Sequence, residues 1–297
     1  MKRRSPNSMP TKTTKNIVAS FIAFCVSISF FGCENSRWIT ISEKRIHSIS
    51  GVSSFKDKWI VVHDNKLNGQ PRISLLSETY QLRELNWPSS LLPYDLEAIY
   101  SIPNNKNQYV VMESTGVCYR IVLDETTEQI KIQGKFKLPG LNKSMNLEGV
   151  ALFESDENIK IFYGDRGSNT RPSTLFHADY NVQEDDVKVV SSYSLTLLEQ
   201  MPEKRNIADL VFDESGNLWS SATSDPGNDG PFETRIFRIG KISKQGYFTL
   251  EKPLKSKKTF KNEKVEAMTV FEDGLLLLTD NENFGSSKYF IKLKSLL

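Results

Sequence analysis

A repeated phrase constrains the fold of this chain more than any other feature of its sequence. In each copy, a glutamate stands near the start of a short apolar run. The three clear copies are DLEAIYSI at 95–102, NLEGVALF at 146–153 and KVEAMTVF at 264–271. A second apolar run follows each phrase and ends in an acid 14 to 17 positions after the glutamate. Short apolar runs separated by turns predict paired β-strands rather than helices.

Two weaker copies extend the pattern to five. They are SISGVSSF at 48–55 and NIADLVF at 206–212. The aligned positions of the five copies are Ser50, Glu97, Glu148, Ala208 and Glu266. A repeat of roughly this length, about 40 to 50 residues with several strands in each, is typical of a β-propeller. We therefore expect an all-β propeller with five blades.

The two ends of the chain bear on the number of blades. The segment after Glu266 and the segment between Cys33 and Ser50 together amount to about one further repeat. We expect RWITIS at 37–42 to add the outer strand to the last blade, which closes the ring and removes exposed sheet edges. The two longest steps of the repeat lie on either side of Ala208, and they leave six blades as the alternative.

The N-terminal segment, 1–33, differs from the rest of the chain. It contains five basic residues and no acid, and it includes an apolar run from Ile17 to Phe31. This run is short for a membrane-spanning helix of about 20 residues and fits a signal peptide. It ends in Phe30-Phe31-Gly32-Cys33, which resembles a bacterial lipobox, although the two phenylalanines depart from that pattern. An uncleaved anchor and an ordinary secretory signal are the alternatives.

We therefore expect residues 1–33 to be a lipoprotein signal peptide, Cys33 to be lipidated and residues 34–297 to form one propeller domain. The protein would be exported and anchored by lipid to the membrane of a bacterial cell envelope. Without the first segment, 38 − 5 = 33 basic residues face 36 acids. No basic stripe with interleaved aromatic residues is present, so we expect no nucleic-acid partner. Cys118 is then the only cysteine besides Cys33, and we expect it in the core.

The repeated glutamates are the candidate functional residues. The first strand of each propeller blade lines the central channel, so Glu97, Glu148 and Glu266 should converge there, with Asp209 as a fourth acid. Carboxylates in a confined site raise one another's pKa unless a cation or a hydrogen-bond donor compensates. Three compensations remain open: backbone N–H groups of the neighbouring blade, a bound Ca²⁺ ion, or an arginine such as Arg166 or Arg205. The arginine alternative would suggest a site for an anionic ligand.

Signals for catalysis are few. The sequence contains no G-x-S-x-G, H-E-x-x-H or P-loop motif, and its three histidines are His47, His63 and His177. His63 follows an apolar run and precedes Asp64, which makes it the histidine of most interest.

Over about residues 45–295 the sequence resembles the SdiA-regulated, YjiK-like β-propeller family. It is more distantly similar to esterase-like phytases and to propellers of the NHL and strictosidine-synthase type. The resemblance is carried by DLEAI with YVVMES, NLEGVALF with YGDRGSN, IADLVFDESGNLW, and VEAMTV with LLLLTDNEN. It implies an envelope protein, a link to calcium in some relatives, and channel acids at Glu97, Glu148 and Glu266. The copies with GVSS and IADL depart from the acid pattern.

Two functions are compatible with these features. The first is a membrane-tethered binding or scaffold propeller with a structural or regulatory calcium in its channel. Its partner would be a protein or a small anionic ligand at the propeller face. The alternative is a calcium-assisted phosphoesterase or esterase-like hydrolase, in which the clustered carboxylates hold the metal.

Overall fold

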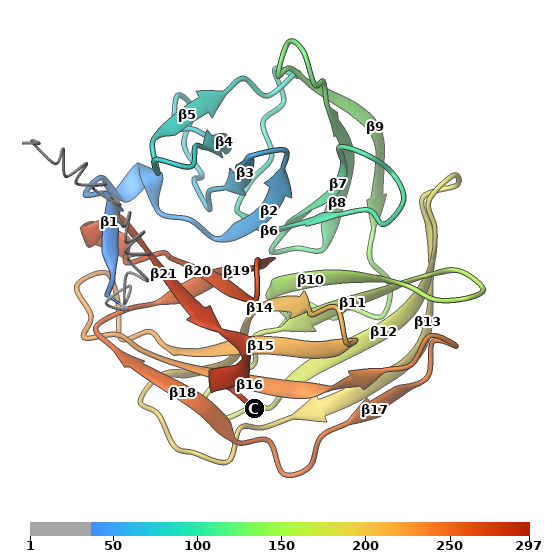
Figure 1. Ribbon diagram of the computed structural model, residues 1–297, viewed down its shortest axis with the longest axis vertical. Helices are drawn as coiled ribbons and strands as arrows, with labels where there is room; N and C mark the ends of the chain where they lie inside the picture. Colours follow the sequence, from blue (N-terminus) through green and yellow to red (C-terminus); the bar gives the residue numbers. More distant parts are fainter. Residues whose placement is uncertain (1–36) are drawn as a thin grey trace, which may run out of the picture. The chain divides into compact units, whose positions relative to one another are not determined.

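The computed structural model describes residues 37–297, which form five antiparallel blades around a common centre, four of them with four strands and one with five (Figure 1). Blade one comprises β2 (Gly51–Phe55), β3 (Lys58–Val62), β4 (Ile73–Leu76) and β5 (Leu82–Leu85). Blade two comprises β6 (Leu96–Ser101), β7 (Gln108–Glu113), β8 (Val117–Leu123) and β9 (Ile130–Lys137). Blade three comprises β10 (Leu147–Glu154), β11 (Ile159–Asp165), β12 (Ser173–Asn181) and β13 (Asp186–Leu195).

The last two blades follow the same order. Blade four comprises β14 (Lys204–Phe212), β15 (Asn217–Ser224), β16 (Glu233–Ile242) and β17 (Phe248–Leu250), and β18 (Ser256–Lys261) also pairs with β16. Blade five comprises β19 (Val265–Phe271), β20 (Gly274–Thr279), β21 (Ser286–Lys292) and β1 (Ile39–Ser42). Three short 3₁₀ helices are η1 (Arg45–His47), η2 (Glu282–Phe284) and η3 (Leu293–Ser295).

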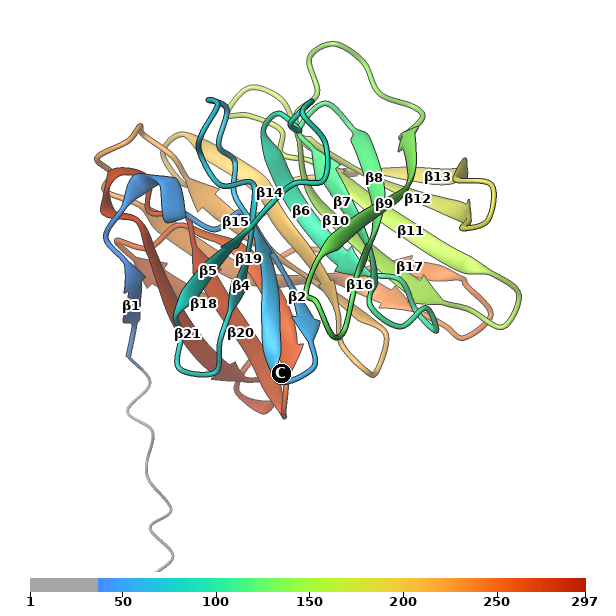
Figure 2. The ribbon, with the colours of Figure 1, turned by 90° about the horizontal axis from the view of Figure 1, so that it is seen from above.

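The five inner strands form a ring, and β1 pairs with the last blade. The inner strands β2, β6, β10, β14 and β19 contact one another in this order, and β19 contacts β2. Strand β1 pairs antiparallel with β21, with Ile39 opposite Lys288 and Thr40 opposite Ser287. Figure 2 shows β1 (blue) beside β21 (red). The two longest steps of the repeat, between Glu148 and Ala208 and between Ala208 and Glu266, contain no sixth blade. They contain the long strands β13 and β16 and the additional strand β18.

Five hydrophobic clusters hold the blades together, one between each pair of neighbours. Cys118 is fully buried in the cluster between blades two and three, which confirms its predicted core position. Burial of apolar area of this kind supplies most of the free energy that favours folding. Within residues 37–297, no helix has the length and apolar character needed to cross a membrane.

Tyr100 closes one end of the central channel. It packs against the clusters on three blade interfaces, and its hydroxyl accepts a hydrogen bond from the backbone N–H of Phe212 at 3.3 Å. A small cavity of about 160 Å³ remains beside Tyr100. The channel is thus obstructed at this end. We call the opposite end, where the inner strands begin, the upper face.

Candidate charge site at the axial mouth

The three predicted glutamates occupy equivalent β-bulges. The strand register shifts between Leu96 and Ala98, between Leu147 and Gly149, and between Val265 and Ala267, so each bulge contains one of the glutamates. A bulge adds one residue to a strand and re-aims its side chain. Glu97, Glu148 and Glu266 are 7%, 2% and 3% exposed. The repeated phrase therefore encodes a bulge that carries a buried carboxyl at the start of an inner strand.

The small residue after each glutamate has a packing reason. A Cβ atom on Gly149 would lie 2.8 Å from the backbone nitrogen of Leu210 in the next blade. Neighbouring inner strands therefore approach too closely at this point for any side chain, which explains the glycine of NLEGVALF. In the other two copies the position is alanine, and Ala98 and Ala267 are 1% and 0% exposed, so only a small side chain is present there as well.

Glu148 is compensated by two arginines. Nη1 of Arg166 donates a hydrogen bond to Oε1 of Glu148 at 3.1 Å, and Nη1 of Arg205 lies 3.9 Å from the same oxygen. Burial raises the pKa of Glu148, and the charges of Arg205 and Arg166 limit that rise. Both arginines were considered as channel cations from the sequence, and both lie there.

Lys264 is the centre of a second group of charges. Its ammonium lies 2.6 Å from a carboxylate oxygen of Glu282, 3.2 Å from Glu266, 3.4 Å from Asp225 and 3.5 Å from Asp280. Burial disfavours the ammonium, but Asp280 and Glu266 raise the pKa of Lys264 well above its ordinary value. Burial likewise opposes the charge of Asp280, yet Lys264 holds the pKa of that carboxyl far below its usual range.

Arg205 and Arg45 extend this group. Arg205 pairs with Asp225 and lies 3.5 Å from Oε1 of Glu266. That oxygen accepts no hydrogen bond of good geometry from the described residues, so charge alone compensates it. Arg45 lies 2.9 Å from Asp64, 3.0 Å from Glu282 and 3.8 Å from Asp280.

One carboxyl at the mouth has no partner. Lys66 lies 2.9 Å from Asp95, but no described residue forms a hydrogen bond or an ion pair with Glu97. Burial raises the pKa of Glu97 well above its ordinary value, and the neighbouring carboxyls Glu148, Asp95, Asp64 and Glu266 raise it further. Glu97 is therefore a buried acceptor that forms no direct ion pair, although the charges of Lys66 and Arg205 act on it at longer range.

We call these residues the axial charge cluster. The acids are Asp64, Asp95, Glu97, Glu148, Asp225, Glu266, Asp280 and Glu282, and the cations are Arg45, Lys66, Arg72, Arg166, Arg205 and Lys264. Six formal positive charges against eight negative charges leave 6 − 8 = −2 in this part of the chain. The raised pKa values of Glu97 and Glu266 follow from this imbalance and from burial, and protons or a positively charged ligand can offset it.

Asp209 lies apart from the axial charge cluster. Its carboxyl oxygens accept the backbone N–H groups of Leu210 at 2.7 Å and of Met268 at 2.5 Å. Because Met268 belongs to β19, Asp209 ties blade four to blade five. In the first blade, the hydroxyl of Ser50 donates to the carbonyl of Leu96 at 2.7 Å and ties blade one to blade two.

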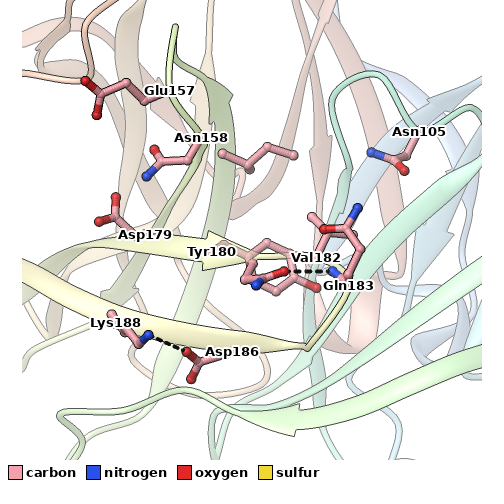
Figure 3. Close-up of a pocket in the computed structure, with 11 residues that line it drawn as sticks. Asn105, Glu157, Asn158, Asp179, Tyr180, Val182, Gln183, Asp186 and Lys188 are labelled. Atoms are coloured by element: carbon pink, nitrogen blue, oxygen red, sulfur yellow. Dashed lines mark hydrogen bonds and ion pairs between the residues drawn. The ribbon is translucent and has the colours of Figure 1, made fainter.

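His63 and a separate polar pocket lie outside the axial charge cluster. His63 is fully buried between the carbonyl of Ser48 and the hydroxyl of Ser74, and burial lowers its pKa to about 4. A pocket of about 560 Å³ between blades two and three is lined by polar side chains (Figure 3). Its Asp186 already pairs with Lys188 at 3.2 Å.

Glu97, Glu148 and Glu266, three of the four acids expected to bind calcium, lie in the axial charge cluster, and Asp209 lies outside it. Ca²⁺ takes six to eight oxygen ligands in proteins, at about 2.3 to 2.6 Å. Glu148 and Glu266 are engaged with arginine and lysine, which leaves Glu97 as the uncommitted carboxyl. Among residues 37–297, no group of three or more His, Cys, Asp or Glu side chains has the geometry to hold a metal ion.

The sequence did not indicate Lys264, Arg45 or Lys66 as cluster members. Lys264 stands two positions before Glu266, so the two-residue period of a strand could have placed it on the same face. Arg45 and Lys66 come from loops, where no periodicity applies. Their pairing is determined by how the five blades bring distant loops together.

Comparisons with known proteins support the fold. No family model matches the sequence, and no curated protein matches it. Among solved structures, the chain is similar to a glycoside hydrolase, with 12% identity, a TM-score of 0.51 and coverage of 84% of this chain and 62% of that one. It is also similar to a bifunctional GH43-CE protein from Bacteroides eggerthii, with 14% identity, a TM-score of 0.52 and coverage of 84% and 34%. The chain thus spans less than two thirds of either protein, and the likeness shows the fold alone.

Proposed function

We propose that this protein is a binding propeller of the cell envelope, which holds a positively charged group of its ligand at the axial mouth. One observation carries the proposal: Glu97 is only 7% exposed and forms no hydrogen bond or ion pair with the described residues, within a cluster whose formal charges sum to −2. A bound cation would restore the balance and lower the pKa of Glu97.

An ammonium or guanidinium group suits this site better than the other ligand classes. An anion would meet a net negative mouth, and Arg166 and Arg205 already hold Glu148 and Asp225. A calcium ion needs more free oxygen ligands than Glu97 supplies. An ammonium group needs only a few acceptors.

Thermal melts with butylammonium and with Ca²⁺ test this proposal. The full chain in detergent is melted at pH 8 with EGTA, with butylammonium chloride, and with Ca²⁺. A ligand at about 100 times its Kd adds about 2.7 kcal/mol, which raises the melting temperature by several degrees. We expect butylammonium to raise Tm for the wild type but not for Glu97→Gln. A rise with Ca²⁺ alone, or with neither, would contradict the proposal.

A hydrolase is the second candidate, and one contrast favours it. Glu97 and Glu148 influence each other's ionisation, but only Glu148 has arginines beside it. Enzymes often place two carboxyls in different environments, so that one stays protonated as the general acid and the other stays ionised as the general base. The calcium-assisted phosphoesterase expected from sequence belongs to this class, and the structurally similar glycoside hydrolases add aryl glycosides to the substrates worth testing. Turnover of 4-nitrophenyl phosphates or glycosides that Glu97→Gln abolishes would support this second function.

The envelope location is a separate proposal, supported by the lipobox-like sequence before Cys33, which lies outside the described residues. The SdiA-regulated, YjiK-like resemblance implies the same location. Labelled palmitate should be incorporated when the full chain is expressed in a bacterium, and Cys33→Ala should abolish the label. Unlabelled wild-type protein in the soluble fraction would show that this location is wrong.

A further inference from the structure

Exposed apolar side chains lie in three of the upper-face loops that carry members of the axial charge cluster. Leu67, Tyr94 and Phe284 are 67%, 54% and 58% exposed. Each lies within two positions of a member of the axial charge cluster, because Leu67 follows Lys66, Tyr94 precedes Asp95, and Phe284 follows Glu282 by two. We call these three side chains the apolar rim. Large exposed apolar groups beside buried charge mark surfaces that other proteins cover.

The Phe284 side of this rim contains a pocket. Its volume is about 430 Å³, and it lies between the loop after β15 and helix η2, lined by Pro231, Phe232, Phe284, Gly230, Asp229 and Asn262. Asn283 fixes the two walls, since its side chain donates to Oδ1 of Asp229 at 2.9 Å. Its backbone N–H also donates to the carbonyl of Asn228 at 3.3 Å. The pocket can accept an apolar side chain of moderate size.

We propose that the upper face docks a protein segment that places a lysine or arginine in the axial mouth and an apolar side chain in the Phe284 pocket. This inference rests on the proposed function and names the kind of ligand. Charge complementarity favours a basic segment, because the formal charges at the mouth sum to −2 and Glu97 forms no direct ion pair. A free metal ion or a small polar amine would make no use of the apolar rim. A basic side chain with an apolar neighbour would use both features.

Labelled peptides measure the two contributions separately. The probes are acetyl-Lys-(Gly)n-Leu-amide peptides with one to three glycines, each paired with a version ending in Ala. Each glycine extends the reach by at most about 3.6 Å. Fluorescence anisotropy with the full chain gives the Kd. For the best spacer we expect the Leu peptide to bind at least about 10-fold more tightly than its Ala counterpart, as expected for partial burial of a leucine.

Variants of the protein assign each contribution. Phe284→Ala should make the Leu and Ala peptides bind with the same Kd, while binding should still require the lysine of the peptide. Tyr247→Ala is the matched control, because Tyr247 is 77% exposed in the turn between β16 and β17, on the opposite face. It should leave every affinity unchanged. Glu97→Gln should weaken the Leu and Ala peptides by the same factor.

The outcomes separate this inference from the proposed function. Equal binding of the Leu and Ala peptides at every spacer would overturn the protein-segment inference and leave the cation site intact. Peptide binding that Phe284→Ala does not change would also overturn it. If butylammonium fails to stabilise the protein and no lysine peptide binds, both proposals are wrong.

Discussion

Glu97, Glu148 and Glu266 occupy the same bulge in three blades but have different electrostatic environments. Glu148 lies beside Arg166 and Arg205, and Glu266 lies beside Lys264 and Arg205. Glu97 forms no direct ion pair, and Lys66 and Arg205 act on it only at longer range. Burial raises the pKa of all three carboxyls. The same residue in the same backbone geometry therefore has a direct cationic partner in two blades and none in the third.

Replacing Glu97 with Gln should stabilise the free protein at alkaline pH. The pKa of Glu97 is higher in the folded than in the unfolded state, so the folded state binds more protons above the unfolded pKa of about 4.3. Stability is therefore lost as pH rises from that value through the folded pKa. Because glutamine does not titrate, we expect the Tm of Glu97→Gln to exceed that of the wild type only slightly at pH 4 and by several degrees at pH 8. A pH-independent difference would contradict the raised pKa.

Replacing Glu148 with Gln should have the same sign of effect as Glu97→Gln but a smaller size. Burial also raises the pKa of Glu148, but Arg205 and Arg166 limit that rise. The amide oxygen of glutamine can still accept the hydrogen bond from Arg166. We therefore expect the gain in Tm between pH 4 and pH 8 to be smaller for Glu148→Gln than for Glu97→Gln, as thermal melts of both variants would measure. A larger gain for Glu148→Gln would show that the arginines do not compensate Glu148.

At the scale of the strand, local pattern determined what could be predicted from sequence. Apolar runs of strand length and the recurrence of Glu-Gly or Glu-Ala were sufficient to place five inner strands and three channel glutamates. The partners of those glutamates were not predictable in the same way. Lys264 meets Asp225 and Glu282 because loops from blades four and five converge, and no local periodicity encodes that contact.

Strand β14 shows how one blade does without the glutamate. It has Ala208 at the aligned position, and the next residue, Asp209, accepts the backbone N–H of Met268 in β19. Asp209→Ala would leave that N–H buried and unpaired, at a cost of about 1 to 3 kcal/mol. We expect faster hydrogen exchange at Met268 and a lower Tm. Wild-type exchange at this amide would show that the tie between blades is unimportant.

At the scale of the whole molecule, ring closure depends on β1, whose partner β21 is the last strand of the chain. Trp38, just before β1, adds to the closure by packing against Phe260 and Tyr289, with ring centroids 5.2 and 5.1 Å apart. Without β1, the outer edge of β21 would expose unpaired backbone groups, which template aggregation. The closure therefore controls both stability and solubility.

This dependence predicts the effect of shortening the chain. A protein that begins at Glu43 lacks β1 and Trp38, whereas one that begins at Ser36 keeps both. Loss of a packed tryptophan alone costs about 3 to 5 kcal/mol, so we expect the shorter protein to melt at least about 6 °C lower and to scatter light on heating. Trp38→Ala in the longer protein separates the two contributions, since it removes the aromatic packing but keeps the strand. If the shorter protein melts like the longer one without aggregating, β19, β20 and β21 hold blade five in the ring without β1, and the closing strand has no energetic role.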